Sequence, residues 1–367
     1  MADRLAFILG KDPATTHGGD MTLFRTMRAI AGERFESEII CLSEDPSRTD
    51  PDVVRVRKPP LSLTSLAAES LLRRRSLVHT RFDVDGLRDA VEQSRANRFV
   101  ALHSHLAEPY LRARGVRPSD DLLVSTEILE SKIWPLTHGW AGRLEARRLR
   151  RDERRVIRSA RAVAGYDRAD VTKLQAAGIA AHWLPLTLPP ARAVDVATTP
   201  PCIVMLGNRM WRPNAEAART MVSLWPRISA GIPDAQLLLV GEPPARSRSE
   251  LPLGVRDLGS VGNVDDVLDH ARVLTAPVTV GGGVRVKLLE AAARGIPVVC
   301  STEAVGSIEA AIGMAAAADE DEFVNRCRAF LLDADLAAAE GTRLYEINAR
   351  RWTDRIAQDA VLEWLRS

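Results

Sequence analysis

The chain has 367 residues, of which 46% are hydrophobic and 27% are charged, and its formal net charge is only +2. This composition is ordinary for a globular protein, and the length is sufficient for two domains that each have a core. The near balance of charge excludes a protein that binds polyanions with its whole surface, and no apolar run approaches the ~20 residues that cross a bilayer.

The N-terminus and the cysteines indicate a cytoplasmic protein. The apolar stretch in MADRLAFILG is too short for a signal peptide and is predicted as a first strand. The cysteines match neither a metal motif nor a disulfide framework and suit a reducing compartment; they are Cys41, Cys202, Cys300 and Cys327. We expect any membrane contact to be peripheral, at the inner membrane face.

Apolar runs alternate with helical patterns along the first half, which predicts a parallel sheet covered by helices. Gly18-Gly19 opens the loop after the first strand, and a helix is predicted over Met21–Ala31. The predicted strands of this half are Leu5–Leu9, Ser37–Leu42, Phe99–Leu102, Leu122–Ser125 and Ala162–Gly165.

A proline-rich stretch, residues 186–201, separates the two halves and is predicted to be a linker. We expect an N-terminal domain over residues 1–187, completed by a C-terminal helix over about 350–367, and a C-terminal domain over residues 200–349. The apolar spacing predicts that this closing helix runs unbroken from Leu344 to Arg366. Two such halves place a cleft between them, and ligands bind at the carboxyl ends of the strands.

The same alternation begins again after the linker. Helices are predicted over Ala215–Ile228 and Val264–Ala271. The predicted strands are Ile203–Leu206, Gln236–Val240, Val273–Pro277 and Val298–Cys300.

The most informative run is VGGGVRVKLLEAAARGIPVVC, in which a glycine triplet follows a strand and opens a short helix. The exposed N–H groups and the dipole of such a helix N-terminus favour a phosphate. Arg285 and Lys287 add positive charge, and Glu290 offers an acceptor for hydroxyl groups about one turn later. A nucleoside diphosphate needs this combination of donors and a carboxylate, although a glycine-rich turn without a ligand is the alternative.

An arginine-rich segment extends over residues 143–161. Glu145, Asp152 and Glu153 interrupt it, which favours a solvated helix with internal ion pairs. The alternative is contact with an anionic membrane near a lipid-linked acceptor. Because aromatic residues do not interleave with these arginines, we do not expect binding to nucleic acid.

Over residues 202–310 the chain resembles the retaining glycosyltransferases of the GT-B fold, family 4 or group 1. The matching segments are MLGNRMWRPNAEA, PDAQLLLVGEPP, LGSVGNVDDVLDHA and APVTVGGGVRVKLLEAAARGIPVV. Weaker counterparts in the first half are HGGDMTLFR, VALHSHLAEPYL and VAGYDRADVTKL. The resemblance implies two Rossmann-like domains that face a central cleft.

The resemblance also implies roles for individual residues of the second half. Glu290 would bind the ribose of the donor, Lys287 and Arg285 would face its diphosphate, and Arg209 or Arg212 would supply a further cation. The other residues that it places at the donor are Gly18, Gly19, Gly207, Val261, Asn263, Gly282, Gly283, Gly306 and Glu309. Gly282 stands where the family usually has the first of two glutamates, which affects how the transferred sugar is held.

The resemblance leaves the N-terminal catalytic residue open. His103 and His105 follow a strand, where alternate residues point the same way, so both side chains face either the substrate or solvent. Glu127 ends a later strand. These three residues are the candidates for contact with the reacting sugar.

The predicted function is transfer of a sugar from a nucleoside diphosphate donor to an acceptor hydroxyl, with retention and without a metal or other cofactor. The acceptor would be a glycan, a lipid-linked sugar or a natural-product aglycone. Two alternatives stay open. One is a GT-B epimerase or pseudo-glycosyl coupling enzyme, and the other is an inactive partner that binds a nucleotide sugar.

Overall fold

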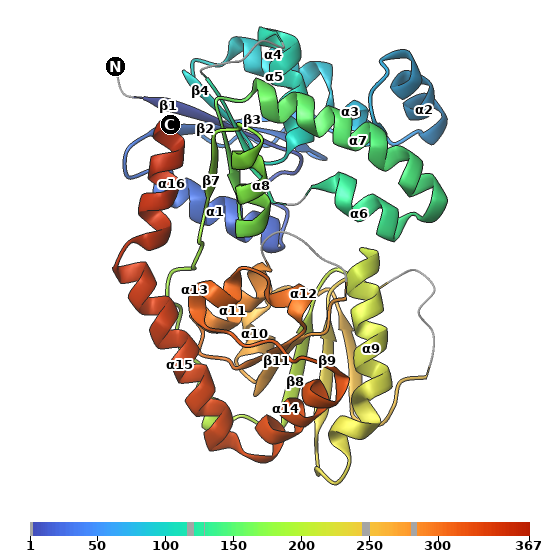
Figure 1. The fold of residues 1–367 in the computed structure, drawn as a ribbon, viewed down its shortest axis with the longest axis vertical. Helices are drawn as coiled ribbons and strands as arrows, with labels where there is room; N and C mark the ends of the chain where they lie inside the picture. The colour runs from blue at the N-terminus through green and yellow to red at the C-terminus, as the bar shows by residue number, and fades with distance from the viewer. Residues whose placement is uncertain (1–2, 116–120, 128, 244–249, 280–284) are drawn as a thin grey trace. The chain divides into compact units, whose positions relative to one another are not determined.

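The protein is described here from a computed structural model, which covers residues 3–115, 121–127, 129–243, 250–279 and 285–367 (Figure 1). The chain forms two compact units. The first, called the N-terminal domain below, is Met1–Leu184 together with Gln358–Ser367. The second, called the C-terminal domain, is Pro185–Ala357.

The N-terminal domain contains a seven-stranded sheet in the order β3-β2-β1-β4-β5-β6-β7, and each neighbouring pair is parallel. Its strands are β1 (Arg4–Leu9), β2 (Glu36–Ser43), β3 (Val53–Arg57), β4 (Arg98–Ala101), β5 (Leu122–Thr126), β6 (Ala162–Gly165) and β7 (Ala181–Trp183). The central strand β1 is almost wholly buried, as expected for a parallel sheet covered on both faces.

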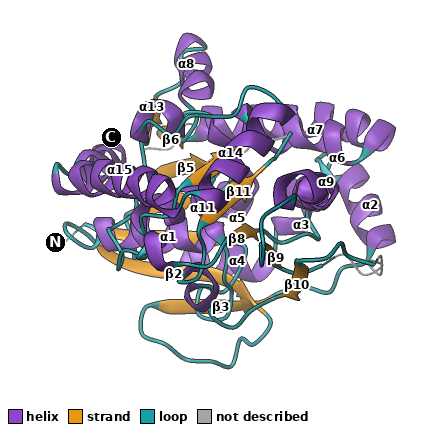
Figure 2. Ribbon diagram, turned by 90° about the horizontal axis from the view of Figure 1, so that it is seen from below, coloured by secondary structure: helices purple, strands orange, loops and turns teal. Residues whose placement is uncertain are grey.

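Helices surround this sheet, as the purple ribbons of Figure 2 show. They are α1 (Gly19–Ala31), α2 (Leu63–Leu72), α3 (Leu77–Phe82), α4 (Asp85–Gln93), α5 (Glu108–Arg114), α6 (Glu130–Thr137), α7 (Gly139–Ser159) and α8 (Arg168–Ala176), with a 3-10 turn at Ser104–Ala107. The helix α1 packs on the sheet through Phe24, whose ring meets that of Phe7 edge to face at 5.5 Å.

The C-terminal domain contains a five-stranded parallel sheet in the order β10-β9-β8-β11-β12. Its strands are β8 (Cys202–Leu206), β9 (Gln236–Val240), β10 (Val255–Gly259), β11 (Val273–Ala276) and β12 (Val298–Cys300). The order reverses between β8 and β11, and the carboxyl ends of strands at such a reversal are where open α/β sheets bind ligands.

Helices follow β8, β10, β11 and β12 of the C-terminal domain, and four helices follow β12 in succession. The helices of this domain are α9 (Arg212–Ser229), α10 (Asp265–Leu268), α11 (Val286–Ala293), α12 (Thr302–Val305), α13 (Ile308–Ile312), α14 (Glu320–Leu332) and α15 (Ala334–Thr353), with a 3-10 turn at Val196–Thr198. The last helix of the chain is α16 (Ile356–Arg366). Within the described residues, no helix combines the length and the apolar character that crossing a membrane requires.

The closing helix is not continuous, so that prediction was wrong. The helix α15 ends at Thr353, and α16 begins at Ile356. Between them Arg355 has φ +59°, a left-handed conformation that interrupts the helical hydrogen bonds. The chain can therefore change direction here, and the guanidinium of Arg98 in β4 donates to the carbonyl oxygen of Leu365 in α16.

Most predicted strands are confirmed with boundaries that differ by one or two residues, and β6, β9 and β12 match their predicted bounds. The helix α9 begins at Arg212, three residues before its predicted start. Pro213 is accommodated in the first turn of α9, because the backbone N–H groups of a first turn have no hydrogen-bond partner within the helix. The helix α10 ends at Leu268, short of the predicted Ala271.

Candidate functional site

Two glycines let the ends of β8 and β9 approach each other closely. Gly207 has φ +155° and Gly241 has φ +126°, and a Cβ on Gly241 would lie 2.1 Å from the carbonyl oxygen of Gly207. A Cβ on Gly207 would lie 2.8 Å from Cγ of Asn214 in α9. Gly207 was predicted to lie at the nucleotide-sugar donor. In the structure it allows close packing, which brings the Asn214 amide to the end of the sheet.

Arg209 lies just beyond β8 and is 5% exposed. Its two terminal nitrogens donate to the carboxylate of Asp257 at 2.7 and 2.5 Å, and one of them also donates to the carbonyl oxygen of Gly241 at 2.6 Å. The hydrogen bonds from Arg209 hold the pKa of Asp257 below its usual value. This bidentate pair links the end of β8 to β10. Arg209, which was predicted to contact the diphosphate, therefore already forms an ion pair with Asp257.

Lys287 lies in the first turn of α11 and points to the end of β8. Its Nζ donates to the carbonyl oxygen of Leu206 at 2.5 Å and to Oδ1 of Asn214 at 3.2 Å. Desolvation, with a contribution from the charge of Arg285, lowers the pKa of Lys287 to about 7, and the charge of Glu290 opposes this shift. The ammonium thus has neutral oxygen partners, and within the described residues it forms no ion pair.

Arg285 immediately precedes α11 and is 8% exposed. Its guanidinium carbon lies 5.7 Å from the ring centre of Trp211, in a cation–π contact. Burial lowers the pKa of Arg285 to about 10. Trp211 therefore packs against the guanidinium of Arg285. Glu290 follows Lys287 by three residues, which places both on one side of α11.

Arg212, the alternative cation, lies at the first residue of α9. Its side chain is 56% exposed and pairs with Glu216 one turn later, at 2.7 Å. The structure therefore separates the two arginines that the sequence could not choose between. Arg209 is buried and engaged by Asp257, and Arg212 is exposed at the helix N-terminus.

The other described residues of the C-terminal domain that are predicted to contact the nucleotide-sugar donor lie in loops or at the start of a short helix. Asn263 is exposed in the loop before α10, and its Oδ1 accepts the N–H of Asp265 at 3.1 Å; Val261 precedes it in the same loop. Gly306 follows α12 with φ +46°, a conformation that favours glycine. Glu309 is exposed in the first turn of α13. Gly282 and Gly283 lie outside the described residues.

In the N-terminal domain, Gly18 and Gly19 stand at the start of α1. Gly18 has φ +133°, and a Cβ there would lie 3.1 Å from Oδ1 of Asp20. Asp20 accepts a hydrogen bond from Nζ of Lys11 at 2.7 Å. This ion pair lies at the carboxyl end of β1 and was not predicted from the sequence, because nothing distinguishes Lys11 from other loop residues.

His103, His105 and Glu127 come together, but not through the strand alternation that the sequence suggested. His103 follows β4 in a loop, and His105 lies in the 3-10 turn at Ser104–Ala107. Their rings stack at 5.1 Å with an interplanar angle of 7°. Nε2 of His103 lies 3.9 Å from Oε2 of Glu127 at the end of β5. His105 is 6% exposed and also packs on Phe82.

Burial disfavours the charged forms of all three side chains. Desolvation lowers the pKa of His103 to about 4 and that of His105 well below its usual value. Desolvation and the charge of Asp20 raise the pKa of Glu127 well above its usual range. The imidazole of His103 thus faces a carboxyl whose charged form is disfavoured, and both side chains can exchange hydrogen bonds with hydroxyl groups.

The sequence reading missed Asn214 and Asp257. Asn214 stands in the Trp-Arg-Pro-Asn loop at the start of α9, and its position beside a proline at a helix start is a usable signal. Asp257 lies 48 positions after Arg209, and a pair at that separation leaves no local pattern.

The comparisons with known proteins define the fold. The solved structures that are similar to this chain include sucrose-phosphate synthase from Thermosynechococcus elongatus, with a TM-score of 0.72, 16% identity and 98% of each chain covered. WaaG, a glycosyltransferase involved in lipopolysaccharide biosynthesis, has a TM-score of 0.68 and 15% identity over 97% of this chain and 98% of its own. Anabaena HepE in complex with UDP-glucose has a TM-score of 0.67 and 14% identity over 99% of each chain.

These similarities show that the chain has the GT-B fold, which confirms the predicted fold class. Within the C-terminal domain, residues 200–333 match the family model described as "Glycosyl transferases group 1". A search among curated proteins gave no match.

Proposed function

We propose that the protein transfers a sugar from a nucleoside diphosphate donor to an acceptor hydroxyl. One observation carries this proposal: within the matched residues 200–333, Lys287 and Arg285 converge beside the end of β8. Lys287 is held there by neutral oxygens, so it has charge available for an incoming diphosphate. HepE, which has the same fold, was solved with UDP-glucose bound, and this supports a nucleotide-sugar donor.

The chemistry needs stabilisation of a leaving diphosphate. As the bond from the anomeric carbon to the diphosphate oxygen breaks, negative charge grows on that oxygen, and preorganised cations lower the barrier most when water is excluded. Lys287 would neutralise this charge, with Arg285 beside it, and Glu290 would accept hydrogen bonds from the ribose. Arg209 would contribute indirectly, by fixing the strand ends through Asp257.

The proposal extends to retention of the anomeric configuration. The acceptor oxygen would form its bond to the anomeric carbon on the face that the diphosphate leaves. The acceptor proton would pass to an oxygen of the leaving diphosphate. This route requires no carboxylate nucleophile, and His103 and Glu127 would position sugar hydroxyls through hydrogen bonds. We further propose that the cations replace a metal, so that a chelator leaves turnover unchanged.

The test is to incubate purified protein with several nucleotide sugars and a panel of acceptors, and to measure the nucleoside diphosphate released. Release that requires an acceptor supports transfer, and the anomeric signals of the product report retention. Conversion of the donor sugar without an acceptor would indicate an epimerase. Binding of nucleotide sugars without turnover across the panel would indicate an inactive partner protein.

A further inference from the structure

The helix α7 has two chemically different faces. On the inward face, Glu145, Asp152 and Glu153 are between 2% and 6% exposed. Asp152 accepts the backbone N–H of Ser76 at 2.6 Å, and Glu153 accepts the backbone N–H of Ser131 at 3.0 Å. The acidic residues therefore stabilise the start of neighbouring segments and do not neutralise the outer surface of α7.

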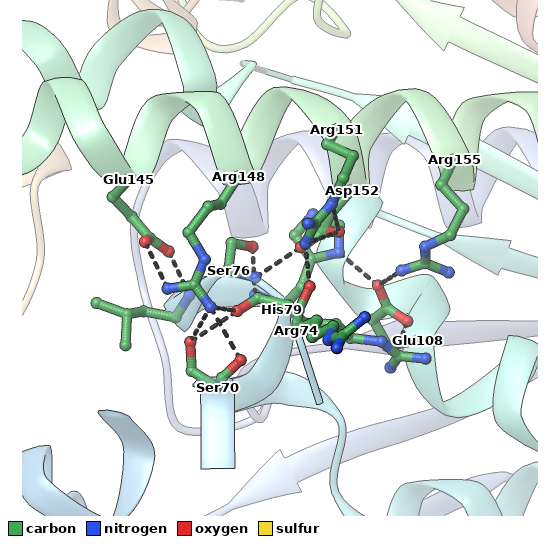
Figure 3. A network of polar contacts seen from close by, with 12 residues as sticks. Ser70, Arg74, Ser76, His79, Glu108, Glu145, Arg148, Arg151, Asp152 and Arg155 are labelled. Atoms are coloured by element: carbon green, nitrogen blue, oxygen red, sulfur yellow. Dashed lines mark hydrogen bonds and ion pairs between the residues drawn. The ribbon is translucent and has the colours of Figure 1, made fainter. Parts of the chain in front are cut away.

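Three arginines of α7 take part in the same inward network (Figure 3). Arg148 donates to Glu145 at 3.1 Å and to the hydroxyl of Ser70 at 2.7 Å. Arg151 pairs with Asp152, and Arg155 pairs with the fully buried Glu108. These contacts attach α7 to the segment before α3 and to α5, so the inward face is fixed.

The outward face carries five other arginines, which we call the arginine stripe: Arg143, Arg147, Arg150, Arg154 and Arg158. Their spacing of three or four residues places them in a single row along α7. All five are exposed, and in the described part of the chain neither a hydrogen bond nor an ion pair engages their side chains. Four of them line a surface hollow of about 630 Å³.

Exposed apolar side chains adjoin one end of the arginine stripe. Trp140 is 76% exposed and, three residues before Arg143, continues the same row. Leu144 is 57% exposed and Leu136 of α6 is 54% exposed. Figure 1 and Figure 2 both place α2, α6 and α7 together at one edge of the N-terminal domain.

From these observations we propose that the arginine stripe, with Trp140 at its end, binds the surface of an anionic phospholipid membrane. From Trp140 to Arg158 the row is about 27 Å long, and a straight row of unpaired cations fits an extended anionic surface. An exposed tryptophan beside a basic helix face is typical of helices that lie at a membrane interface. This inference does not depend on the proposed transfer activity.

Binding to vesicles tests the proposal. The full chain is sedimented with vesicles of phosphatidylcholine and phosphatidylglycerol in equal parts, and with vesicles of phosphatidylcholine alone. We expect binding to the anionic vesicles only, and its loss at about 1 M NaCl, where charges are screened beyond about 3 Å. Equal binding to both vesicles, or to neither, would overturn the proposal, and so would binding to duplex DNA but not to vesicles.

A charge-matched pair of variants separates the arginine stripe from net charge. The stripe variant is R147E/R150E/R154E, and the control variant R34E/R57E/R95E changes three exposed arginines elsewhere in the N-terminal domain. Each stripe arginine should contribute about fivefold to partitioning onto the anionic surface. We therefore expect the stripe variant to lose at least tenfold in vesicle binding and the control to keep most of it. Equal losses would contradict the assignment to α7.

Circular dichroism spectra of both variants establish that the fold is retained. A second arm adds soluble inorganic diphosphate to the wild type. Because a membrane surface offers many phosphates at once, we expect diphosphate at millimolar concentration to compete weakly. Complete displacement would overturn the membrane assignment in favour of a site for a free phosphate compound.

Discussion

The two domains use buried charge in opposite ways. In the N-terminal domain the buried carboxylate of Glu108 is surrounded by His79 at 2.6 Å, Arg75 at 2.8 Å and Arg155. In the C-terminal domain Lys287 is held by a carbonyl and an amide oxygen. Removing the counter-charge of a buried ion pair destabilises the fold, because a charge is left buried without a partner. A cation whose hydrogen bonds go to neutral oxygens retains attraction for a charged ligand.

The same contrast recurs within the C-terminal domain. Arg209 and Lys287 both point to the carboxyl ends of the strands, and the sequence proposed both for the diphosphate. Asp257 engages Arg209, and a family resemblance cannot reveal this partner. The partner of a cation therefore decides between a structural role and a ligand-binding role. Each prediction below tests one side of this comparison.

The largest expected effect is on stability, from Glu108→Gln. The change leaves Arg75 and Arg155 without the carboxylate that they share, and breaking such a buried pair costs about 3 kcal/mol. Urea denaturation measures the free energy of unfolding. The control is Glu216→Gln, which removes an exposed pair with Arg212 and should change that energy by less than about 1 kcal/mol. Equal effects would contradict the structural role.

The protonation of Glu108 should make the free energy of unfolding depend on pH. Burial alone would raise the pKa of Glu108, but the hydrogen bond with His79 and the charges of Arg155 and Arg75 hold it below the usual value. Because the folded state favours the ionised form, Glu108 stabilises the fold above about pH 4.5, and this contribution is lost as the pH falls through the lowered pKa. In Glu108→Gln the acid-dependent loss should be smaller.

The next effect is on activity, from Lys287→Ala. Removing a preorganised charge from a leaving group usually costs about 100-fold or more in rate. We expect kcat/KM for donor turnover to fall by that amount while the melting temperature stays close to that of the wild type. Lys173→Ala is the control, because that side chain is 75% exposed in α8. Turnover by Lys287→Ala at the wild-type rate would refute its role.

Donor affinity should depend on pH in a direction set by Lys287. Its pKa of about 7 in the free protein means that the charged form is lost as the pH rises. A bound diphosphate favours the charged form, so affinity for a nucleotide sugar should fall about tenfold between pH 6 and pH 8. Calorimetric titration measures it. In Lys287→Arg the affinity should be nearly flat over this range, since arginine stays charged.

The smallest effect is expected for Arg212→Ala. The side chain is exposed and already pairs with Glu216, so its attraction for a diphosphate is screened by water. We expect donor affinity to fall by no more than about threefold in calorimetric titrations. A loss as large as that of Lys287→Ala would mean that Arg212, and not Lys287, supplies the main cation.

The sequence predicted the fold well where the signal was local. Apolar runs located β6, β9 and β12, and the glycine loop with its following helix located α11. The break at Arg355 escaped prediction, because an arginine carries no local signal for a left-handed conformation. The short β3 was also missed, since VVRVR is only partly buried and lies in a polar stretch.

The candidate site was predictable in its residues but not in their partners. Lys287, Arg285 and Glu290 could be chosen because they surround one helix N-terminus. Asp257 depends on pairing between distant strands. The stacking of His103 on His105 depends on a 3-10 turn that strand alternation did not foresee. The acidic residues of α7 look like partners for its arginines in sequence, and Glu145 and Asp152 do pair with Arg148 and Arg151. Their further bonds to backbone N–H groups of distant segments could not be predicted, because these contacts depend on tertiary packing.

The central claim is that the C-terminal domain binds the diphosphate of a nucleotide sugar through Lys287. Calorimetric titration of uridine, guanosine, thymidine and adenosine diphosphates into the wild type and into Lys287→Ala tests it most directly. The account predicts that at least one nucleotide binds the wild type and that its affinity falls about 100-fold in Lys287→Ala. Equal affinity in the two proteins, or no binding of any nucleotide to the wild type, would contradict it.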